Sequence, residues 1–271
     1  MPIKLIAIDI DGTLLNSHHH LTDEVKIALK KAEEKGVKVV LCTGRPLTGV
    51  QDLIEELDLY SENDYVVTYN GSLIQKTKTK EIVSKFELSH DDYLAIDGLA
   101  RKLNIHLHTE TVDTMYTSNR DISRYTVLES HLVNMPLKYR TQEEMTDELN
   151  ILKMMMIDEP ALLDDAITKI PPAFYEQYTI VKSAPYFLEF LHKEVDKGAA
   201  VKLLAAQLGI DASEVMALGD NENDLPMIQF AGVGIAMGNA TENVKKAASF
   251  ITSSNDEHGV AVAIEKFVLN V

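Results

Sequence analysis

Short apolar runs alternate with helix-like patterns at both ends of the sequence. Residues 3–8 are apolar at nearly every position, which is typical of a strand buried on both faces of a parallel sheet. Apolar side chains then recur at helical spacing from Thr22 until Gly36, and residues 37–41 form a second apolar run. A strand, a helix and a strand in this order predict a βαβ unit, whose crossover is right-handed. The same alternation resumes from Lys197 onward.

The central part of the sequence has a different pattern. Helix-like and strand-like segments are interleaved there without a regular alternation, which is typical of a separate α+β unit. The expected segments are helices at 91–103, 120–133 and 160–170 and strands at 106–117, 151–157 and 179–191. The sequence therefore predicts an α/β core formed by residues 1–84 and 194–271, with residues 85–193 inserted as an α+β domain.

Acidic residues outnumber basic ones: the 271 residues include 42 Asp and Glu against 26 Lys and Arg, a net charge of −16. Nucleic acids and anionic membranes bind clustered Lys and Arg, so this charge argues against both as partners. A hydrophobic content of 45% is enough to bury a core, and the single cysteine, Cys42, excludes an intramolecular disulfide. The sequence has no secretory signal pattern and no apolar run of the roughly 18 residues that a membrane span needs. We therefore expect a soluble cytoplasmic protein.

Two acidic clusters follow two of the predicted core strands. Asp9 and Asp11 come directly after the first strand, and residues 220–224 follow the strand predicted at 215–218. Ligands of an open α/β sheet bind at the carboxyl ends of its strands, so these acids are expected to line a site. One such cluster alone is as readily an acidic turn or a helix cap. Two clusters that supply oxygen ligands together favour a Mg²⁺ site.

Two further segments have the chemistry of an anion site. Thr43, Gly44 and Arg45 follow the second predicted strand, and a helix is expected to begin at Pro46. A hydroxyl, an unencumbered backbone N–H and a helix N-terminus all favour negative charge. Lys197 opens the helix that re-enters the core, where it could neutralise a phosphate, although a lysine at a helix start is usually exposed on the surface.

Taken together, these segments resemble the four ordered motifs of the haloacid dehalogenase (HAD) superfamily of phosphohydrolases: Asp9–Thr13, Thr43–Arg45, Lys197 and Gly219–Asp224. The Thr-Gly-Arg and Gly-Asp-x-x-Asn-Asp forms resemble the Cof-type branch, and residues 182–189 with 196–198 are similar to its YidA-like sugar phosphatases. Thr43 follows Thr13 by 30 positions, whereas Lys197 follows Thr43 by 154. The insertion therefore lies between the second and third motifs, as in C2-capped phosphatases.

This resemblance implies a Rossmann-like HAD core with a parallel sheet and helices on both faces, and an inserted C2-type cap. It also implies a Mg²⁺-dependent phosphatase that hydrolyses small phosphomonoesters, above all sugar phosphates, through an aspartyl-phosphate. Asp9 is then the nucleophile and Asp11 the general acid and base. The implied Mg²⁺ ligands are Asp9, Asp11 through its backbone carbonyl, and Asp220, with Asp224 in support. The implied phosphate ligands are the backbone N–H of Ile10, Thr43, Gly44, Lys197 and Asn223.

Two other functions remain open at this point. A phosphosugar mutase would share every core residue, although the position of the insertion speaks against it. A non-catalytic sensor of a phosphorylated ligand would be expected to lose Asp9 or Asp11, and both are present. The expected partner is in each case a small phosphorylated metabolite, and the protein could be a monomer or a homodimer.

Several other conspicuous residues have simple structural interpretations. His18–His20 is expected to be a solvated loop. His106 and His108 share one face of a predicted strand, and an exposed sheet surface is a more typical place for them than a substrate contact. Met154–Met156 and Cys42 lie in apolar strands and are expected to pack in the core.

Overall fold

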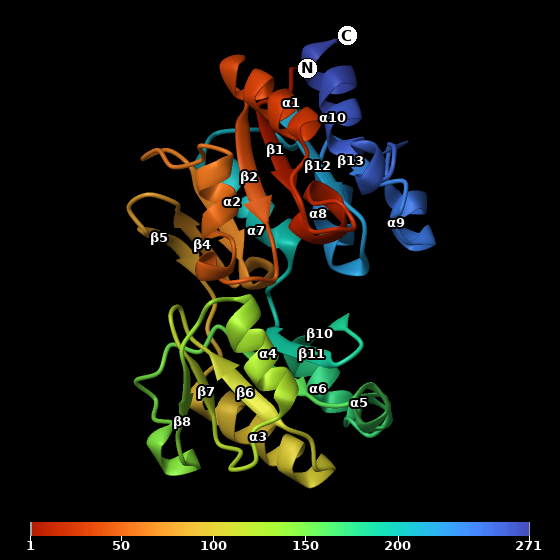
Figure 1. Cartoon of the computed structure of the whole chain (residues 1–271). Helices are drawn as coiled ribbons and strands as arrows, with labels where there is room; N and C mark the ends of the chain where they lie inside the picture. The colour runs from red at the N-terminus through yellow and green to blue at the C-terminus, as the bar shows by residue number, and fades with distance from the viewer. Residues whose placement is uncertain (1, 271) are drawn as a thin grey trace. The chain divides into compact units, whose positions relative to one another are not determined.

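The computed structural model describes residues 2–270 and divides them into two compact units (Figure 1). The first unit contains the chain up to Gly44, Asp52–Ser84 and all residues from Asp196 onward. The second contains Lys85–Val195 and also the short segment Arg45–Gln51. Within the described residues, no helix combines the length and the apolar character that crossing a membrane requires.

The first unit is built on an eight-stranded sheet in the order β14-β13-β12-β1-β2-β3-β4-β5. The central strand β1 pairs in parallel with both β2 and β12, whereas β4 runs antiparallel to β3. The strands are β1 (Leu5–Ile8), β2 (Lys38–Cys42), β3 (Tyr65–Thr68), β4 (Leu73–Lys76), β5 (Ile82–Lys85), β12 (Val215–Gly219), β13 (Val233–Ala236) and β14 (Phe250–Ile251).

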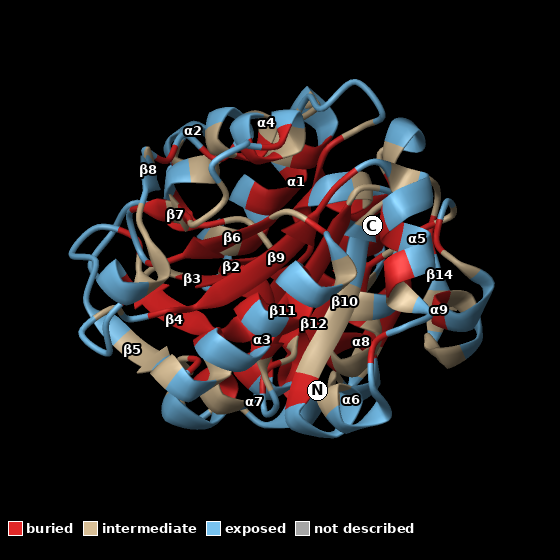
Figure 2. Cartoon of the chain, turned by 90° about the horizontal axis from the view of Figure 1, so that it is seen from below, coloured by how far each residue is buried: buried red, intermediate tan, exposed pale blue. Residues whose placement is uncertain are grey.

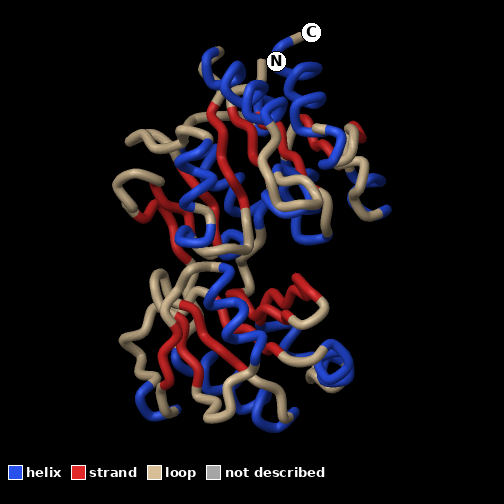
Figure 3. The backbone as a smooth tube through the Cα atoms, viewed as in Figure 1, coloured by secondary structure: helices blue, strands red, loops and turns tan. Residues whose placement is uncertain are grey.

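Helices flank this sheet on both faces, which confirms the predicted Rossmann-like α/β core (Figure 3). The helices are α1 (Asp23–Glu34), α2 (Gln51–Glu56), α7 (Lys197–Gln207), α8 (Leu225–Phe230), α9 (Glu242–Ala247) and α10 (Gly259–Ile264). Side chains of α7 such as Val201 and Leu204 pack with Leu5 and Val40 of the sheet in one apolar cluster. Helix α1 begins directly after Thr22, where the helical spacing predicts its start, and packs against α10.

The second unit is built on a six-stranded sheet in the order β10-β11-β9-β6-β7-β8. Its strands are β6 (Leu107–Glu110), β7 (Met115–Thr117), β8 (Leu137–Tyr139), β9 (Lys153–Ile157), β10 (Tyr178–Ala184) and β11 (Phe187–His192). Its helices are α3 (His90–Leu103), α4 (Arg124–Leu132), α5 (Pro160–Ile167) and α6 (Pro172–Gln177). The single strand expected at 106–117 is therefore two strands, β6 and β7, joined by a turn in which Thr111 N donates to Thr114 O over 3.0 Å.

The two faces of the second sheet are covered differently. Helices α3 and α5 supply Ile96 and Leu163 to an apolar cluster with Met154 and Met156. On the other face, Tyr125 of α4 packs with Met155 and its neighbours. Figure 2 shows most strands of both sheets buried beneath helices whose outer faces are exposed. The expectation that Met154–Met156 pack in the core is confirmed, because all three have 0% of their surface exposed.

The expectation of an exposed sheet surface is wrong for His108. Its side chain is 1% exposed, and its Nε2 lies 3.2 Å from Glu110 Oε1. His106 lies just before β6, where its Nδ1 is 2.7 Å from Asp158 Oδ2. The alternation of residues along a strand gives no information about α4. Glu129 of that helix is buried and interacts with the charges of Lys153 and Glu110.

Candidate active site

Three strands of the first sheet end at the positions predicted for the site. Asp9 follows β1, Thr43 follows β2 and Asp220 follows β12. Since β1 pairs in parallel with both other strands, their carboxyl ends lie side by side. Asp9 and Thr43 are buried, with 6% and 1% of their surfaces exposed. Both side chains therefore belong to the interior of the site and not to the outer surface.

The structure gathers three carboxylates into one group. Asp9, Asp220 and Asp224 each offer an oxygen, and these atoms all lie within 4.8 Å of one another. The carboxylate of Asp11 is not a member of this group: it is 46% exposed, and its Oδ1 lies 3.8 Å from His19 Nδ1. Asp224, expected only in a supporting position, is a full member of the group.

Local backbone geometry fixes Asp220. The Thr13 hydroxyl donates to Asp220 Oδ1 over 2.9 Å, although the two residues are 207 positions apart. The turn after β1, which carries Thr13, requires glycine at position 12, because the φ of this residue is +81°. A Cβ atom on Gly12 would lie only 2.6 Å from Asp220 Oδ2. The turn after β1 therefore both holds this carboxylate and leaves room for it.

Lys197 is the basic group of the site. It is the first residue of α7, whose Asp196 cap accepts a hydrogen bond from Ala199 N over 2.7 Å. The Lys197 Nζ contacts Asp9 and donates to Asp224 Oδ1 over 2.6 Å. Only 1% of this lysine is exposed, so the alternative of a surface lysine does not apply. Burial opposes its charge, but the carboxylates of Asp224 and Asp9 outweigh that effect and raise its pKa.

Asp224 joins the lysine to the loop after β12. Its Oδ2 accepts hydrogen bonds from the backbone N–H groups of Asp220 and Asn221, over 2.9 and 3.0 Å. Its Oδ1 accepts the hydrogen bond from Lys197 described above. With both oxygens used and 0% of its surface exposed, Asp224 braces the loop that presents Asp220.

The site carries more negative than positive charge. Burial and the neighbouring Asp224 raise the pKa of Asp9 well above its usual value, although Lys197 opposes the shift. Burial and Asp224 likewise raise the pKa of Asp220 to about 6. Three carboxylates around one ammonium group provide oxygen donors and an excess negative charge, a combination that suits a hard divalent cation such as Mg²⁺.

Three of the residues predicted to bind phosphate, Thr43, Gly44 and Asn223, meet around Asn70, which sequence reasoning had not placed in the site. Asn70 N donates to Thr43 O over 2.8 Å, and Asn70 Oδ1 accepts from Asn223 Nδ2 over 3.1 Å. Gly44 packs against the same asparagine amide. The Asn70–Gly71 dipeptide predicted only a hairpin turn between β3 and β4, and that turn is present.

Ile10 and Cys42 are the chain neighbours of Asp9 and Thr43, respectively. Ile10 is fully buried and begins the single turn Ile10–Leu14 after β1. Cys42 is also fully buried, and burial raises the pKa of its thiol to about 12. Since the thiolate is the reactive form of cysteine, Cys42 is a core residue and not a nucleophile.

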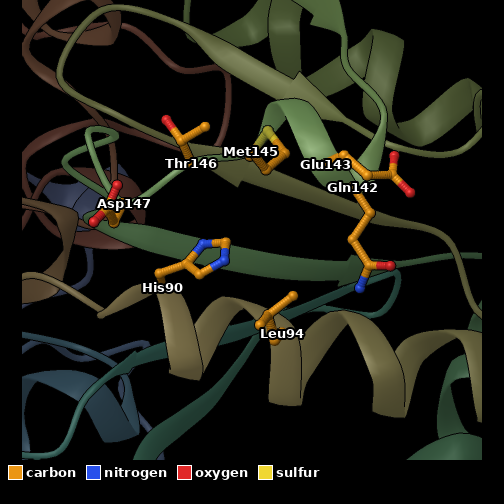
Figure 4. A pocket seen from close by; sticks show the side chains of 7 residues that line it. All are labelled: His90, Leu94, Gln142, Glu143, Met145, Thr146 and Asp147. Carbon is orange, nitrogen blue, oxygen red and sulfur yellow. The ribbon is translucent and has the colours of Figure 1, made fainter.

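A cavity of about 420 Å³ lies in the second unit, and none of the predicted site residues lines it (Figure 4). It is lined by His90, Leu94, Gln142, Glu143, Met145, Thr146 and Asp147. Glu143 and Asp147 supply negative charge to this lining, which disfavours a phosphate. The cavity does not compete with the site at the strand ends as a place for phosphate chemistry.

Comparison with known proteins shows the family to which the chain belongs. A family model described as haloacid dehalogenase-like hydrolase matches residues 6–264. The chain is 52% identical over 266 residues to "Putative phosphatase YxeH" of Bacillus subtilis, with 98% of each chain covered. It is 35% identical over 267 residues to the 5-amino-6-(5-phospho-D-ribitylamino)uracil phosphatase YcsE of the same organism, covering 98% of this chain and 96% of that protein.

A solved structure extends the similarity to the fold of the whole chain. A protein described as the HAD subclass IIB sugar phosphatase BT4131 matches with a TM-score of 0.80 and 25% identity, covering 97% of this chain and 98% of that one. The resemblance detected in the sequence motifs is thereby confirmed. The chain belongs to the haloacid dehalogenase-like hydrolases, in their Cof-type branch, and is a phosphatase of that family.

Proposed function

We propose that this phosphatase is Mg²⁺-dependent and hydrolyses small phosphomonoesters, above all sugar phosphates, through an aspartyl-phosphate on Asp9. The observation that carries the proposal is the fully buried Lys197 that joins Asp9 to Asp224 beside Asp220. Such an arrangement keeps the carboxylate of Asp9 next to the fixed positive charge of Lys197. That charge can hold a dianionic phosphate in line with the attacking oxygen of Asp9.

The proposed reaction has two displacements at phosphorus. In the first, an oxygen of Asp9 forms a bond to phosphorus as the bond to the substrate's alcohol oxygen breaks, and Asp11 gives that oxygen a proton. In the second, water attacks phosphorus, Asp9 leaves as a carboxylate, and Asp11 accepts the proton of the water. Division into two steps lowers the barrier of a difficult displacement. The exposed carboxylate of Asp11 is suited to exchange protons with both oxygens.

The metal ligands in this proposal are Asp9 and Asp220 through their side chains and Asp11 through its backbone carbonyl. Asp224 supports them by holding the loop of Asp220. When bound there, Mg²⁺ supplies positive charge that offsets the carboxylates and the phosphate. The phosphate itself is held by the Ile10 N–H, Thr43, Gly44, Lys197 and Asn223.

We further propose that the predicted core, residues 1–84 and 194–271, carries the chemistry, and that residues 85–193 act as a C2-type cap that recognises the rest of the substrate. Every proposed catalytic, metal and phosphate residue belongs to the first unit, which supports this division. Two of the three relatives reported above are named for their substrates: BT4131 as a sugar phosphatase and YcsE as a 5-amino-6-(5-phospho-D-ribitylamino)uracil phosphatase. Both names describe a phosphate on a polyhydroxylated carbon chain, which supports that substrate class.

A panel of phosphorylated metabolites, assayed with Mg²⁺ and with a chelator, tests the proposal. We expect release of inorganic phosphate from sugar phosphates with Mg²⁺ and none with the chelator. Activity that survives the chelator contradicts the metal-dependent mechanism. Phosphoryl transfer to a second hydroxyl without phosphate release indicates a mutase, and binding without turnover indicates a sensor.

A further inference from the structure

The turn Tyr69–Gly71, between β3 and β4, has an unusual backbone. All three of its residues have positive φ: +52° at Tyr69, +54° at Asn70 and +110° at Gly71. Glycine adopts such angles readily and asparagine at a small cost, but a tyrosine in this region is uncommon and strained. Tyr69 is fully buried, so the surrounding core holds it in this conformation. Backbone strain of this kind clusters at functional sites, which draws attention to the residue at the centre of the turn.

Asn70, the central residue, is hydrogen-bonded to two of the proposed phosphate ligands. Its backbone N–H donates to Thr43 O over 2.8 Å, which ties the turn to the end of β2. Its side-chain Oδ1 accepts from Asn223 Nδ2 over 3.1 Å. Asn70 is only 3% exposed, so water competes little for these bonds. Since an amide nitrogen carries two hydrogens, the bond to Asn70 also fixes the direction of the second hydrogen on Asn223.

The side-chain amide of Asn70 also packs on Gly44, a third proposed phosphate ligand. A Cβ atom at position 44 would lie 3.0 Å from Asn70 Nδ2 and 3.3 Å from Asn70 Oδ1. Glycine at this position therefore lets the amide lie directly against the backbone. Gly44 follows β2 and Asn223 follows β12, and these two strands flank β1, which ends at Asp9. One buried side chain thus joins the segments on either side of the proposed nucleophile.

Gly71 brings the same turn against the start of α7. A Cβ atom on Gly71 would lie 2.6 Å from the backbone oxygen of Asp196. Asp196 caps α7 and directly precedes Lys197. Both the positive φ and this close approach require glycine at position 71. The turn is therefore in contact with three segments that carry proposed phosphate ligands: the end of β2, the loop after β12 and the start of α7.

We propose that Asn70 is a positioning residue for phosphate binding: it holds the Asn223 amide in the orientation that receives the phosphate. The strained turn holds Asn70 in place for this role. An amide that is oriented before binding avoids the free-energy cost of being ordered when the anion arrives. The inference rests on the proposed role of Asn223 as a phosphate ligand. Every residue that it involves belongs to the first compact unit.

Two substitutions at position 70 separate the side chain from the backbone. Asn70→Gly removes the amide and keeps a residue that adopts positive φ readily. Asn70→Ala removes the same amide and also disfavours the left-handed backbone. Asn104→Gly is the matched control, because Asn104 is an exposed asparagine that ends α3 with a similar φ of +56°.

The affinity for inorganic phosphate in the presence of Mg²⁺ is measured by calorimetry, together with KM and kcat for a hydrolysed sugar phosphate. Loss of the hydrogen bond to Asn223 is expected to raise the phosphate Kd and KM by roughly three- to tenfold in both Asn70 variants. We expect kcat to change much less, because a contact made equally in the ground state and the transition state affects binding and not turnover. Asn104→Gly should keep the wild-type Kd and KM.

A purely structural role for Asn70 gives a different pattern. It would lower the folded fraction, more in Asn70→Ala than in Asn70→Gly, while the Kd and KM of the folded protein stay at their wild-type values. That result overturns the inference. An equal rise of the phosphate Kd in Asn104→Gly overturns it as well.

A double-mutant cycle tests whether Asn70 acts through Asn223. Asn223→Ala alone is expected to raise the phosphate Kd at least as much as Asn70→Gly does. Addition of Asn70→Gly to Asn223→Ala should raise the Kd no further, because the residue that Asn70 positions is then absent. Increases in Kd that multiply in the double variant overturn the inference.

The wild-type protein separates this inference from the proposed function. If the wild type binds phosphate but hydrolyses nothing, the proposed function fails, while the Kd values still decide the role of Asn70. If the wild type hydrolyses sugar phosphates and Asn70→Gly keeps the wild-type Kd, the inference alone fails. Absence of phosphate binding by the wild type overturns both.

Discussion

Lys197 Nζ donates to Asp224 Oδ1 over 2.6 Å at a place where the lysine is 1% and the aspartate 0% exposed. The same ammonium group contacts Asp9. This one buried cation therefore links the start of α7, the end of β1 and the loop after β12. The charge balance of the site depends on it, because each of its two partners would otherwise be an uncompensated buried carboxylate.

Replacement of Lys197 by methionine keeps the volume and removes the charge. We expect the free energy of unfolding to fall by roughly 3 to 5 kcal/mol, because breaking a buried ion pair leaves its partners unpaired. Addition of Asp224→Asn should recover part of this loss without restoring phosphate affinity. Urea denaturation of both variants measures these changes.

Lys182→Met is the control, because Lys182 is 38% exposed and its partner Asp164 is 60% exposed. Removal of an exposed ion pair should change stability by less than about 1 kcal/mol. Equal stabilities of the Lys197 and Lys182 variants would mean that Lys197 contributes no more than an exposed lysine, which contradicts a buried ion pair at this position.

Thr13→Val removes the hydroxyl that donates to Asp220 Oδ1. Residues that orient a metal ligand typically change metal affinity by about 10- to 100-fold when they are mutated. We therefore expect the Mg²⁺ concentration for half-maximal activity to rise at least several-fold in a Mg²⁺ titration. Thr168→Val, which removes only an exposed hydrogen bond to Asp165 O, should leave that concentration unchanged. An unaltered Mg²⁺ requirement in Thr13→Val would exclude Asp220 as a ligand oriented by Thr13.

Glu129 makes the stability of the second unit depend on pH. Burial raises its pKa to about 7 against the opposing charge of Lys153, compared with 4.5 for an ordinary glutamate. The folded chain thus keeps this proton to higher pH than the unfolded chain does. The stabilisation that comes from this bound proton is fully present below pH 4.5. It is lost as the pH rises to about 7, a change of up to about 3 kcal/mol in the free energy of unfolding.

Glu129→Gln removes this titration. We expect the difference in melting temperature between pH 5 and pH 8 to be smaller in this variant than in the wild type. The exposed Glu176→Gln serves as the control and should keep the wild-type difference. If Glu129→Gln keeps it too, Glu129 does not titrate in this range.

Patterns within single elements made much of the fold predictable. The apolar run at residues 3–8 and the helical spacing after Thr22 correspond to β1 and α1. The acids after two strands predicted that Asp9 and Asp220 meet, because parallel neighbouring strands end at the same edge. These are consequences of periodicity and of sheet geometry, both of which can be read from a single sequence.

Features that depend on contacts between distant elements were not predictable in this way. Asn70 orients Asn223, 153 positions away, but its local signal is only that of a turn. The burial of His108 depends on a covered sheet face, which strand alternation does not specify. The segment Arg45–Gln51 lies within the range expected for the core but belongs to the second unit, in which Thr48 donates a hydrogen bond to Val133 O.

The direct test of the central claim is the turnover of Asp9→Asn. This substitution keeps the shape of the side chain and removes the nucleophilic carboxylate, so we expect no detectable hydrolysis of any substrate that the wild type hydrolyses. Circular dichroism should show an intact fold, and the control Asp121→Asn, at an exposed position, should keep wild-type activity. Substantial phosphatase activity in folded Asp9→Asn would contradict the account.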